Sequence, residues 1–237
     1  MEDRISRAKS YPFDIPERSY VYRRGEVHGW DADAAPRNGR VPVLAAGSNQ
    51  SHDQIARKFD GHASAGVIAS QRGRLSDFDV VYAAHLASYG SVPATFQRSP
   101  GTVVRVFVLW LDEAQLARMH ETEGNYTFDQ LDGVRIELDE GAEILGQAYS
   151  YSSKVGCFNH DGACVSLSEI AAAGRRFAAA SQPEILAIVR DRLAPGRALD
   201  AFIGEHIGDE GVRRARSEAI GRDALALGFA RRTISRL

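Results

Sequence analysis

Residues 111–126 read Leu-Asp-Glu-Ala-Gln-Leu-Ala-Arg-Met-His-Glu-Thr-Glu-Gly-Asn-Tyr, and this stretch predicts a short helix with a signal at each end. Asp112 is a preferred N-cap residue, and Gln115 stands three residues later as its capping-box partner. Gly124 is placed to end the helix in the left-handed conformation. The sequence therefore predicts a helix that begins after Asp112 and ends before Gly124.

The apolar side of this predicted helix carries an acid. At about 100° per residue, Leu116, Met119 and Glu123 fall on nearly one face. A carboxylate buried there costs several kcal/mol unless it is hydrogen-bonded or protonated, and burial favours the protonated form. Glu123 is therefore a candidate group for proton transfer. The alternative interpretation is a glutamate at a frayed helix end that holds a neighbouring loop.

Composition limits the classes of protein. The chain has 237 residues, of which 44% are hydrophobic, enough for a substantial core. A net charge of -2 and a pI near 6.4 argue against a nucleic-acid binder. Two cysteines give no disulfide framework, and no apolar run or N-terminal leader predicts a membrane segment or secretion. We expect a cytoplasmic protein with no membrane or nucleic-acid partner.

A strand, a tight turn and a helix are predicted at residues 41–59. Val41 begins the apolar run Val-Pro-Val-Leu-Ala-Ala, which leads into Gly47-Ser48-Asn49. Ser51 and Gln54 have capping-box spacing before the helix. Such a turn directs backbone N–H groups at one point and favours a carboxylate or an oxyanion there. The alternative is a turn that only reverses the chain.

Several apolar runs follow, and they are too closely spaced for regular crossover helices. They cover residues 66–69, 78–86, 102–111, 134–138 and 144–150. This pattern predicts an α+β fold in which a small mixed or antiparallel β-barrel has helices packed on it.

Three regions are expected along the chain. Residues 1–40 are polar and proline-punctuated, and predict an N-terminal arm without chemistry, in which 20–22 could add an edge strand. Residues 41–160 form the barrel domain. Residues 161–237 predict a helical C-terminal extension, with capping-box starts at Ser166 and Ser181.

Other catalytic constellations are not found in the sequence. It contains no Gly-x-Ser-x-Gly elbow, no P-loop and no dinucleotide-binding glycine fingerprint. Cys157, His160 and Cys164 have no evident fourth ligand and are interpreted as structural. His120 lies about 60° from the acid-bearing face and is expected at the surface. The sequence therefore predicts neither a metal site nor a cofactor.

Four segments together resemble the γ-glutamylcyclotransferase-like superfamily in their order and spacing. They are Leu44-Ala45-Ala46-Gly47-Ser48-Asn49, Tyr89-Gly90-Ser91-Val92-Pro93-Ala94-Thr95, Ser99-Pro100-Gly101 and Glu121-Thr122-Glu123-Gly124. The resemblance covers residues 41–151. It implies that Gly47, Ser48 and Asn49 bind the α-amino-acid end of a substrate and that Glu123 is the catalytic acid/base. The loop tyrosine of the family is replaced by Ala46, which opens the pocket, and Tyr149 matches a late pocket-lining tyrosine.

The resemblance implies a transferase or lyase that acts on a small molecule. The substrate amine of a γ-glutamyl amide, or of a related amino-acid derivative, would attack the γ-carbonyl and release 5-oxoproline and an amine. Two alternatives stay open: a non-catalytic binding module on the same fold, and an amide hydrolase that uses the same pocket. A homodimer is also an open alternative. Replacing Glu123 by Gln is expected to remove turnover and to raise stability, because a carboxylate in an apolar surrounding would disappear.

Overall fold

The structure is a computed structural model that describes all residues 1–237. Five strands form its centre: β3 (Val41–Ala45), β4 (Val67–Tyr82), β5 (Ala94–Leu111), β6 (Tyr126–Leu138) and β7 (Ile144–Ser153). β4 pairs with β5, β5 with β3, and β7 with β6, all antiparallel, while β3 and β7 are parallel. Pairing of β4 with β6 closes the ring. The predicted α+β fold with a small mixed barrel is confirmed.

The strands are longer than the apolar runs that predicted them. Runs 66–69 and 78–86 were expected as separate elements, but most of both belongs to the single strand β4. Asp77 has a φ of 63° at the register shift between Ser76 and Phe78, where the strand bends without ending. A β-bulge of this kind lets one strand change direction around a barrel.

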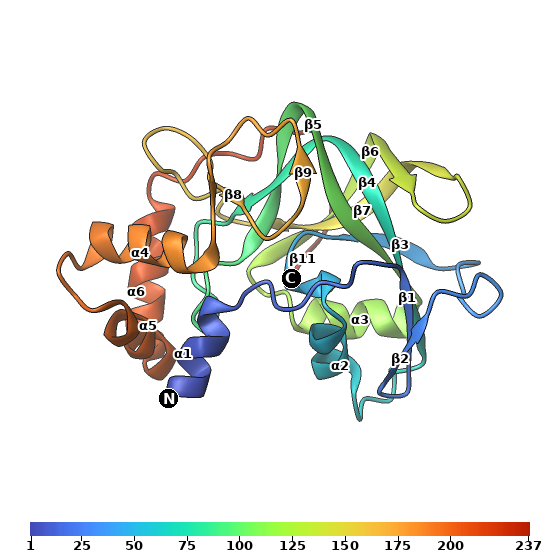
Figure 1. Cartoon of the computed structure of the whole chain (residues 1–237), viewed down its shortest axis with the longest axis horizontal. Helices are drawn as coiled ribbons and strands as arrows, with labels where there is room; N and C mark the ends of the chain where they lie inside the picture. Colours follow the sequence, from blue (N-terminus) through green and yellow to red (C-terminus); the bar gives the residue numbers. More distant parts are fainter.

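Two helices cover one side of the barrel (Figure 1). They are α2 (His52–Phe59) and α3 (Glu113–Glu121). Ile55 and Phe59 of α2 and Met119 of α3 are fully buried against the sheet. Both helices were predicted from their apolar spacing, and each lies next to a turn that contributes to the site described below.

The two helix starts differ in their caps. Asp112 accepts a hydrogen bond from the Gln115 backbone at 2.9 Å, and the Gln115 side chain accepts from the Asp112 backbone at 3.1 Å. The predicted capping box is therefore present. Ser51 precedes α2 without a side-chain cap, and its hydroxyl has no partner. The second predicted box is wrong, because Gln54 instead accepts a hydrogen bond from Arg7.

The end of α3 also differs from expectation. The helix ends at Glu121, and Gly124 does not have positive φ. Glu123 lies in the following turn, where its N–H donates to the His120 carbonyl at 3.2 Å. The residue is nevertheless only 8% exposed, so the turn keeps it on the buried side that the helical pattern indicated.

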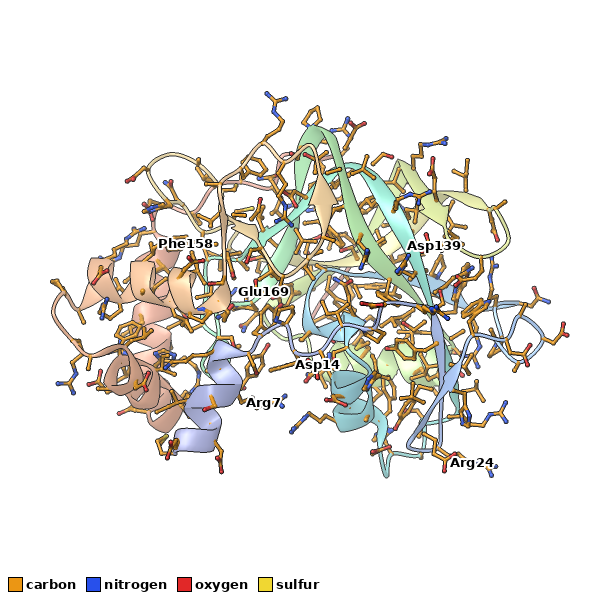
Figure 2. All side chains as sticks on the ribbon, viewed as in Figure 1. Arg7, Asp14, Arg24, Asp139, Phe158 and Glu169 are labelled. Atoms are coloured by element: carbon orange, nitrogen blue, oxygen red, sulfur yellow. The ribbon has the colours of Figure 1, made fainter.

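The N-terminal 40 residues are integrated into the fold. They form α1 (Glu2–Lys9), β1 (Tyr20–Arg23) and β2 (Glu26–Gly29), and β1 pairs with β4. The edge strand was predicted; the helix was not. Figure 2 shows Arg7 on α1 and Asp14 on the segment that leads from α1 toward the barrel.

The C-terminal region is only partly helical. It contains β8 (Ser166–Leu167), β9 (Ala172–Ala173), β10 (Ala179–Ala180), α4 (Gln182–Leu193), α5 (Leu199–Gly208), α6 (Glu210–Gly221) and β11 (Arg232–Arg236). Ser166 was expected to start a helix but lies in β8, where its hydroxyl donates to buried Asp79 at 2.7 Å. Ser181 does cap α4, as predicted. The last strand, β11, pairs with β6 of the barrel and was not predicted.

Helices α4, α5 and α6 form a layer beside the barrel, and α1 packs against it (Figure 1). Phe158 and Phe202 are fully buried in the core that joins this layer to the sheet. None of the helices has the length and apolar character needed to cross a bilayer.

Candidate functional site

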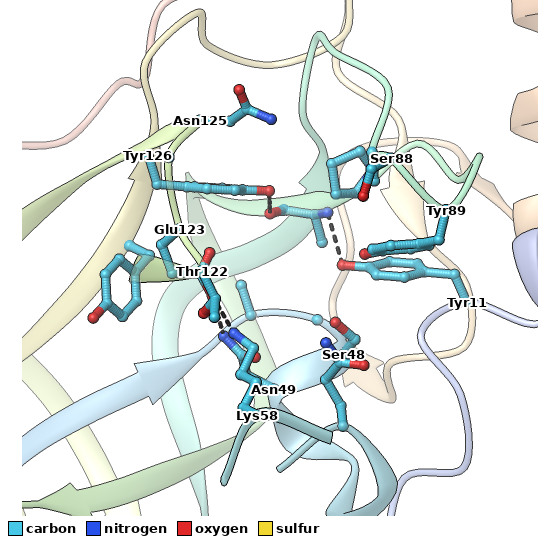
Figure 3. Close-up of a pocket in the computed structure, with 18 of the residues that line it drawn as sticks. Tyr11, Ser48, Asn49, Lys58, Ser88, Tyr89, Thr122, Glu123, Asn125 and Tyr126 are labelled. Carbon is cyan, nitrogen blue, oxygen red and sulfur yellow. Dashed lines mark hydrogen bonds and ion pairs between the residues drawn. The ribbon is translucent and has the colours of Figure 1, made fainter. Parts of the chain in front are cut away.

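A cavity of about 410 Å³ opens where four segments distant in sequence meet (Figure 3). These are the turn after β3, the connection between β4 and β5, the turn between α3 and β6, and the segment after α1. The residues that carry its chemistry are Tyr11, Ala46, Gly47, Ser48, Asn49, Arg57, Lys58, His85, Tyr89, Arg118, Glu123, Tyr126 and Tyr151. The predicted site residues Ala46, Gly47, Ser48, Asn49 and Glu123 therefore line one cavity, and Tyr149 does not.

Glu123 is held by one oxygen of its carboxylate. Oε1 accepts from Asn49 Nδ2 at 2.9 Å and from Lys58 Nζ at 2.6 Å. Figure 3 shows both contacts. Oε2 has no protein donor, and the side chain is 9% exposed. One oxygen thus orients the group, and the other is free to exchange a proton with a ligand.

Lys58 changes the electrostatics that the sequence suggested. Its side chain is 7% exposed, and Nζ also lies 3.3 Å from Met119 Sδ. In general, burial disfavours the charged form of an isolated carboxyl group, whereas an adjacent ammonium favours that form. Glu123 is therefore part of a buried ion pair, and its surrounding is not apolar as predicted. The missed signal is the spacing of Lys58 three residues after Ile55, which places it on the buried face of α2.

The turn after β3 supplies backbone groups to the cavity. Gly47 precedes a short 3-10 helix, η1 (Ser48–Gln50), which leads into α2. The predicted order of strand, turn and helix is confirmed. The first N–H groups of a helical turn have no partner within it, so a ligand oxygen can accept from them. Asn49 additionally ties the turn to Glu123, so the binding and catalytic candidates form one unit.

Gly47 is required by a close approach. A Cβ at this position would lie 1.9 Å from Tyr11 Oη and 3.1 Å from Ala94 Cβ. Tyr11 is 3% exposed, and its hydroxyl accepts from the Ala94 N–H at 2.9 Å. The N-terminal arm, for which no chemistry was predicted, therefore places a phenol in the cavity. No local pattern around Tyr11 indicates this placement.

Three more tyrosines surround the cavity. Tyr126 donates to the Ala94 carbonyl at 3.1 Å, and the Tyr151 hydroxyl lies 2.9 Å from His120 Nδ1. Tyr89 stacks near Tyr11, with ring centroids 6.3 Å apart. Burial raises the pKa of the Tyr11, Tyr89, Tyr126 and Tyr151 phenols above the ordinary tyrosine value, and the charge of Glu123 adds to it. These phenols are therefore neutral hydrogen-bonding groups at physiological pH.

His85 is the buried histidine of the cavity wall. It is 5% exposed, its Nδ1 has no hydrogen-bond partner, and its ring meets Tyr126 edge-on at 5.4 Å. Burial lowers the pKa of His85 to about 4. The imidazole is therefore neutral near pH 7. His85 belongs to no motif in the sequence, so nothing there indicated that it would line the cavity.

Tyr149 does not have the predicted pocket-lining position. Its ring stacks on Phe128, with centroids 5.2 Å apart and an interplanar angle of 8°. Tyr151, two residues later on the same face of β7, lines the cavity instead. His120, expected at the surface, is half-buried, and burial lowers its pKa.

Cys157 and Cys164 lie together in the core, away from the cavity. Both thiols are buried and unbridged, and Gln97 Nε2 lies 3.4 Å from the first sulfur and 3.6 Å from the second. His160 is not part of this group, since its backbone pairs with Ala163 in a turn. The two thiols pack in a small apolar cluster with Val81 and Leu227.

Comparison with known proteins gives low-identity structural likenesses. The chain is similar to a structure titled gamma-glutamyl cyclotransferase, with 16% identity, a TM-score of 0.40, and coverage of 75% of this chain and 98% of that one. An uncharacterized Homo sapiens protein gives 14% identity, a TM-score of 0.40, and 92% and 94% coverage. A solution structure of an Arabidopsis thaliana protein gives 19% identity and a TM-score of 0.38, with coverage of 54% of this chain and 74% of that one. No family model matches the chain. No curated protein matches it either.

These likenesses concern the fold and carry nothing about activity. What the structure confirms is the fold class, a small mixed β-barrel with helices packed on it. Residues of three of the four motif segments line one cavity. Any activity depends on what the residues of the cavity can do.

Proposed function

We propose that this protein is a cyclotransferase that acts on a γ-glutamyl amide or a related small amino-acid derivative and releases 5-oxoproline and an amine. One observation carries the proposal. A buried carboxylate, Glu123, is fixed through Oε1 beside the Gly47–Asn49 turn, and its Oε2 faces the same cavity without a protein donor. The proposal names a general base next to a site for an acyl oxygen or a carboxylate.

In the proposed reaction the Glu123 carboxylate, held 2.6 Å from Lys58 Nζ, acts first as a base. Glu123 takes a proton from the substrate α-ammonium, and the freed amine attacks the γ-carbonyl carbon. A carbon–nitrogen bond forms, and a five-membered ring closes. Because both reacting groups belong to one molecule, the pocket needs only to hold that molecule bent.

Collapse of the tetrahedral intermediate breaks the bond to the leaving amine. Glu123 gives its first proton to that nitrogen and relays the second proton from the ring nitrogen, so the amine leaves as an ammonium. Backbone N–H groups of the Gly47–Asn49 turn stabilise the oxygen on which negative charge develops. The two protons lost by the α-ammonium equal the two gained by the leaving group. The balance needs neither a protein nucleophile nor an outside proton.

Mass spectrometry of the products tests the proposal. The protein is incubated with a panel of γ-glutamyl peptides and γ-glutamyl amines, and 5-oxoproline and free glutamate are measured separately. Release of 5-oxoproline that disappears in Glu123→Gln supports the cyclotransferase. Free glutamate favours the amide hydrolase, in which water attacks. Binding without either product favours the non-catalytic module.

A further inference from the structure

The segment after α1 brings a hydroxyl group into the cavity, and the Tyr11 ring fits there closely. The phenol occupies the space that any side chain at position 47 would need, and it packs against Tyr89. Figure 3 shows Tyr11 and Tyr89 side by side on the cavity wall, across from Glu123. Tyr11 is thus built into the wall of the cavity.

The Tyr11 oxygen is already used as an acceptor. The Ala94 N–H donates to it at 2.9 Å. No protein group accepts the hydroxyl hydrogen. A neutral phenol whose oxygen already accepts from an amide still has its O–H to donate to a ligand.

The position of Tyr11 is secured from outside the barrel. The Ala8 carbonyl accepts from Ser91 Oγ at 2.8 Å, and the Gly90 carbonyl contacts His206 Nε2 of α5 at 2.9 Å. At Gly90 a Cβ would lie 2.7 Å from Ile207 and 3.1 Å from Ala8, so α1, this loop and α5 meet without spare room.

Charged contacts from both ends of α1 add to this junction. Arg4 donates to the Ile207 carbonyl at 3.3 Å, and Lys9 forms an ion pair with Asp200. The C-terminal helices therefore hold the element that carries Tyr11 against the barrel.

We propose that Tyr11 is a substrate-contacting residue whose hydroxyl donates a hydrogen bond to an oxygen of the bound molecule, and that the C-terminal helices serve to place it. The acceptor is either the reacting carbonyl or a carboxylate of the same substrate. Both present the same chemistry, an oxygen that bears negative charge, and the experiment below separates them. This inference rests on the proposed function for the identity of the substrate.

The test compares Tyr11→Phe with wild type in 5-oxoproline release and in calorimetric binding of 5-oxoproline. Phenylalanine keeps the ring beside Gly47 and Tyr89 and removes only the hydroxyl. We expect a loss of about 10- to 100-fold, the usual effect of losing one hydrogen bond to a charged group. A fall in kcat with unchanged binding identifies the reacting carbonyl, and weaker binding with a raised KM identifies the carboxylate.

Tyr20→Phe is the matched control, because Tyr20 is buried and hydrogen-bonded to the Gln50 carbonyl but does not line the cavity. It should leave both readouts unchanged. Gly47→Ala is a second variant; it keeps the Tyr11 hydroxyl but displaces it, and should give a similar loss. Thermal melts show which variants are folded at the assay temperature.

The failures of the two proposals are distinguishable. If wild type releases no 5-oxoproline from any member of the panel, the proposed function is wrong, and binding of 5-oxoproline still tests Tyr11. Equal activity and equal affinity in folded Tyr11→Phe and wild type overturn the role of Tyr11, as does absence of 5-oxoproline binding to wild type.

Discussion

Replacement of Glu123 by Gln separates a catalytic acid from a structural one, and the ion pair with Lys58 changes the expected effect on stability. The sequence indicated an acid in an apolar surrounding, whose removal would stabilise the fold. In the structure the same change leaves the Lys58 ammonium, 7% exposed, beside a neutral amide. We therefore expect Glu123→Gln to destabilise the protein.

The magnitude follows from what Gln retains. Removing one partner of a buried ion pair typically costs about 3–5 kcal/mol. The Gln carbonyl can still accept from Lys58 and Asn49, so we expect a cost at or just below the lower limit of that range, about 2–3 kcal/mol. For a chain of this length that corresponds to a fall in melting temperature of roughly 5–10 °C. Turnover should fall by about 10²- to 10⁴-fold, because an amide cannot accept and return a proton.

The assay is a urea titration combined with 5-oxoproline release on three proteins: Glu123→Gln, Lys58→Met and the double variant. Each single change leaves one buried charge without its counter-charge, whereas the double change replaces the pair with neutral groups. The double variant should recover most of the lost stability and none of the activity. A Glu123→Gln protein as stable as wild type would refute the ion-pair reasoning, and an active one would refute the mechanism.

Three further predictions concern stability. Asp112→Ala should cost about 1 kcal/mol in urea unfolding because it removes a formed N-cap, whereas Ser51→Ala should be nearly neutral because that hydroxyl caps nothing. Stability should fall as the pH is lowered from 6.5 to about 4. The unfolded chain protonates His85 at its ordinary pKa, whereas burial lowers the pKa of His85 in the folded protein to about 4. His85→Gln should flatten this slope. Gly156→Ala should cost roughly 3 kcal/mol or more, since a Cβ would lie 2.3 Å from a carbonyl oxygen, and Gly162→Ala, in open space, should cost only about 1 kcal/mol from its left-handed backbone.

Two outcomes would contradict these expectations. His28→Gln is the control for the pH series, since His28 is exposed, and a flattened slope in that variant would mean that burial of His85 is not the cause. Equal destabilisation by the two glycine variants would mean that backbone conformation, and not the close carbonyl, sets the cost.

Structural features that depend on residues within one short segment could be predicted from the sequence. The cap of α3 could be predicted because Asp112 and Gln115 complete each other within four residues. The strand–turn–helix at 41–59 and the burial of Glu123 followed from spacing alone. Strand ends were less predictable, because β4 continues through Asp77 where the apolar pattern stops and pairing with β5 does not.

The sequence by itself determined the α+β class, the main barrel segments and the acid with its glycine-containing turn, because these depend on periodicity and short-range caps. Only the tertiary structure decided what surrounds that acid. Lys58 reaches Glu123 across 65 positions of chain, and Tyr11 reaches Ala94 across 83. Such contacts form when the barrel closes and α1 packs on the C-terminal helices, and no local pattern encodes them. Their physical effect is large because in a buried site a single ammonium or hydroxyl sets the charge and hydrogen bonding that a ligand meets.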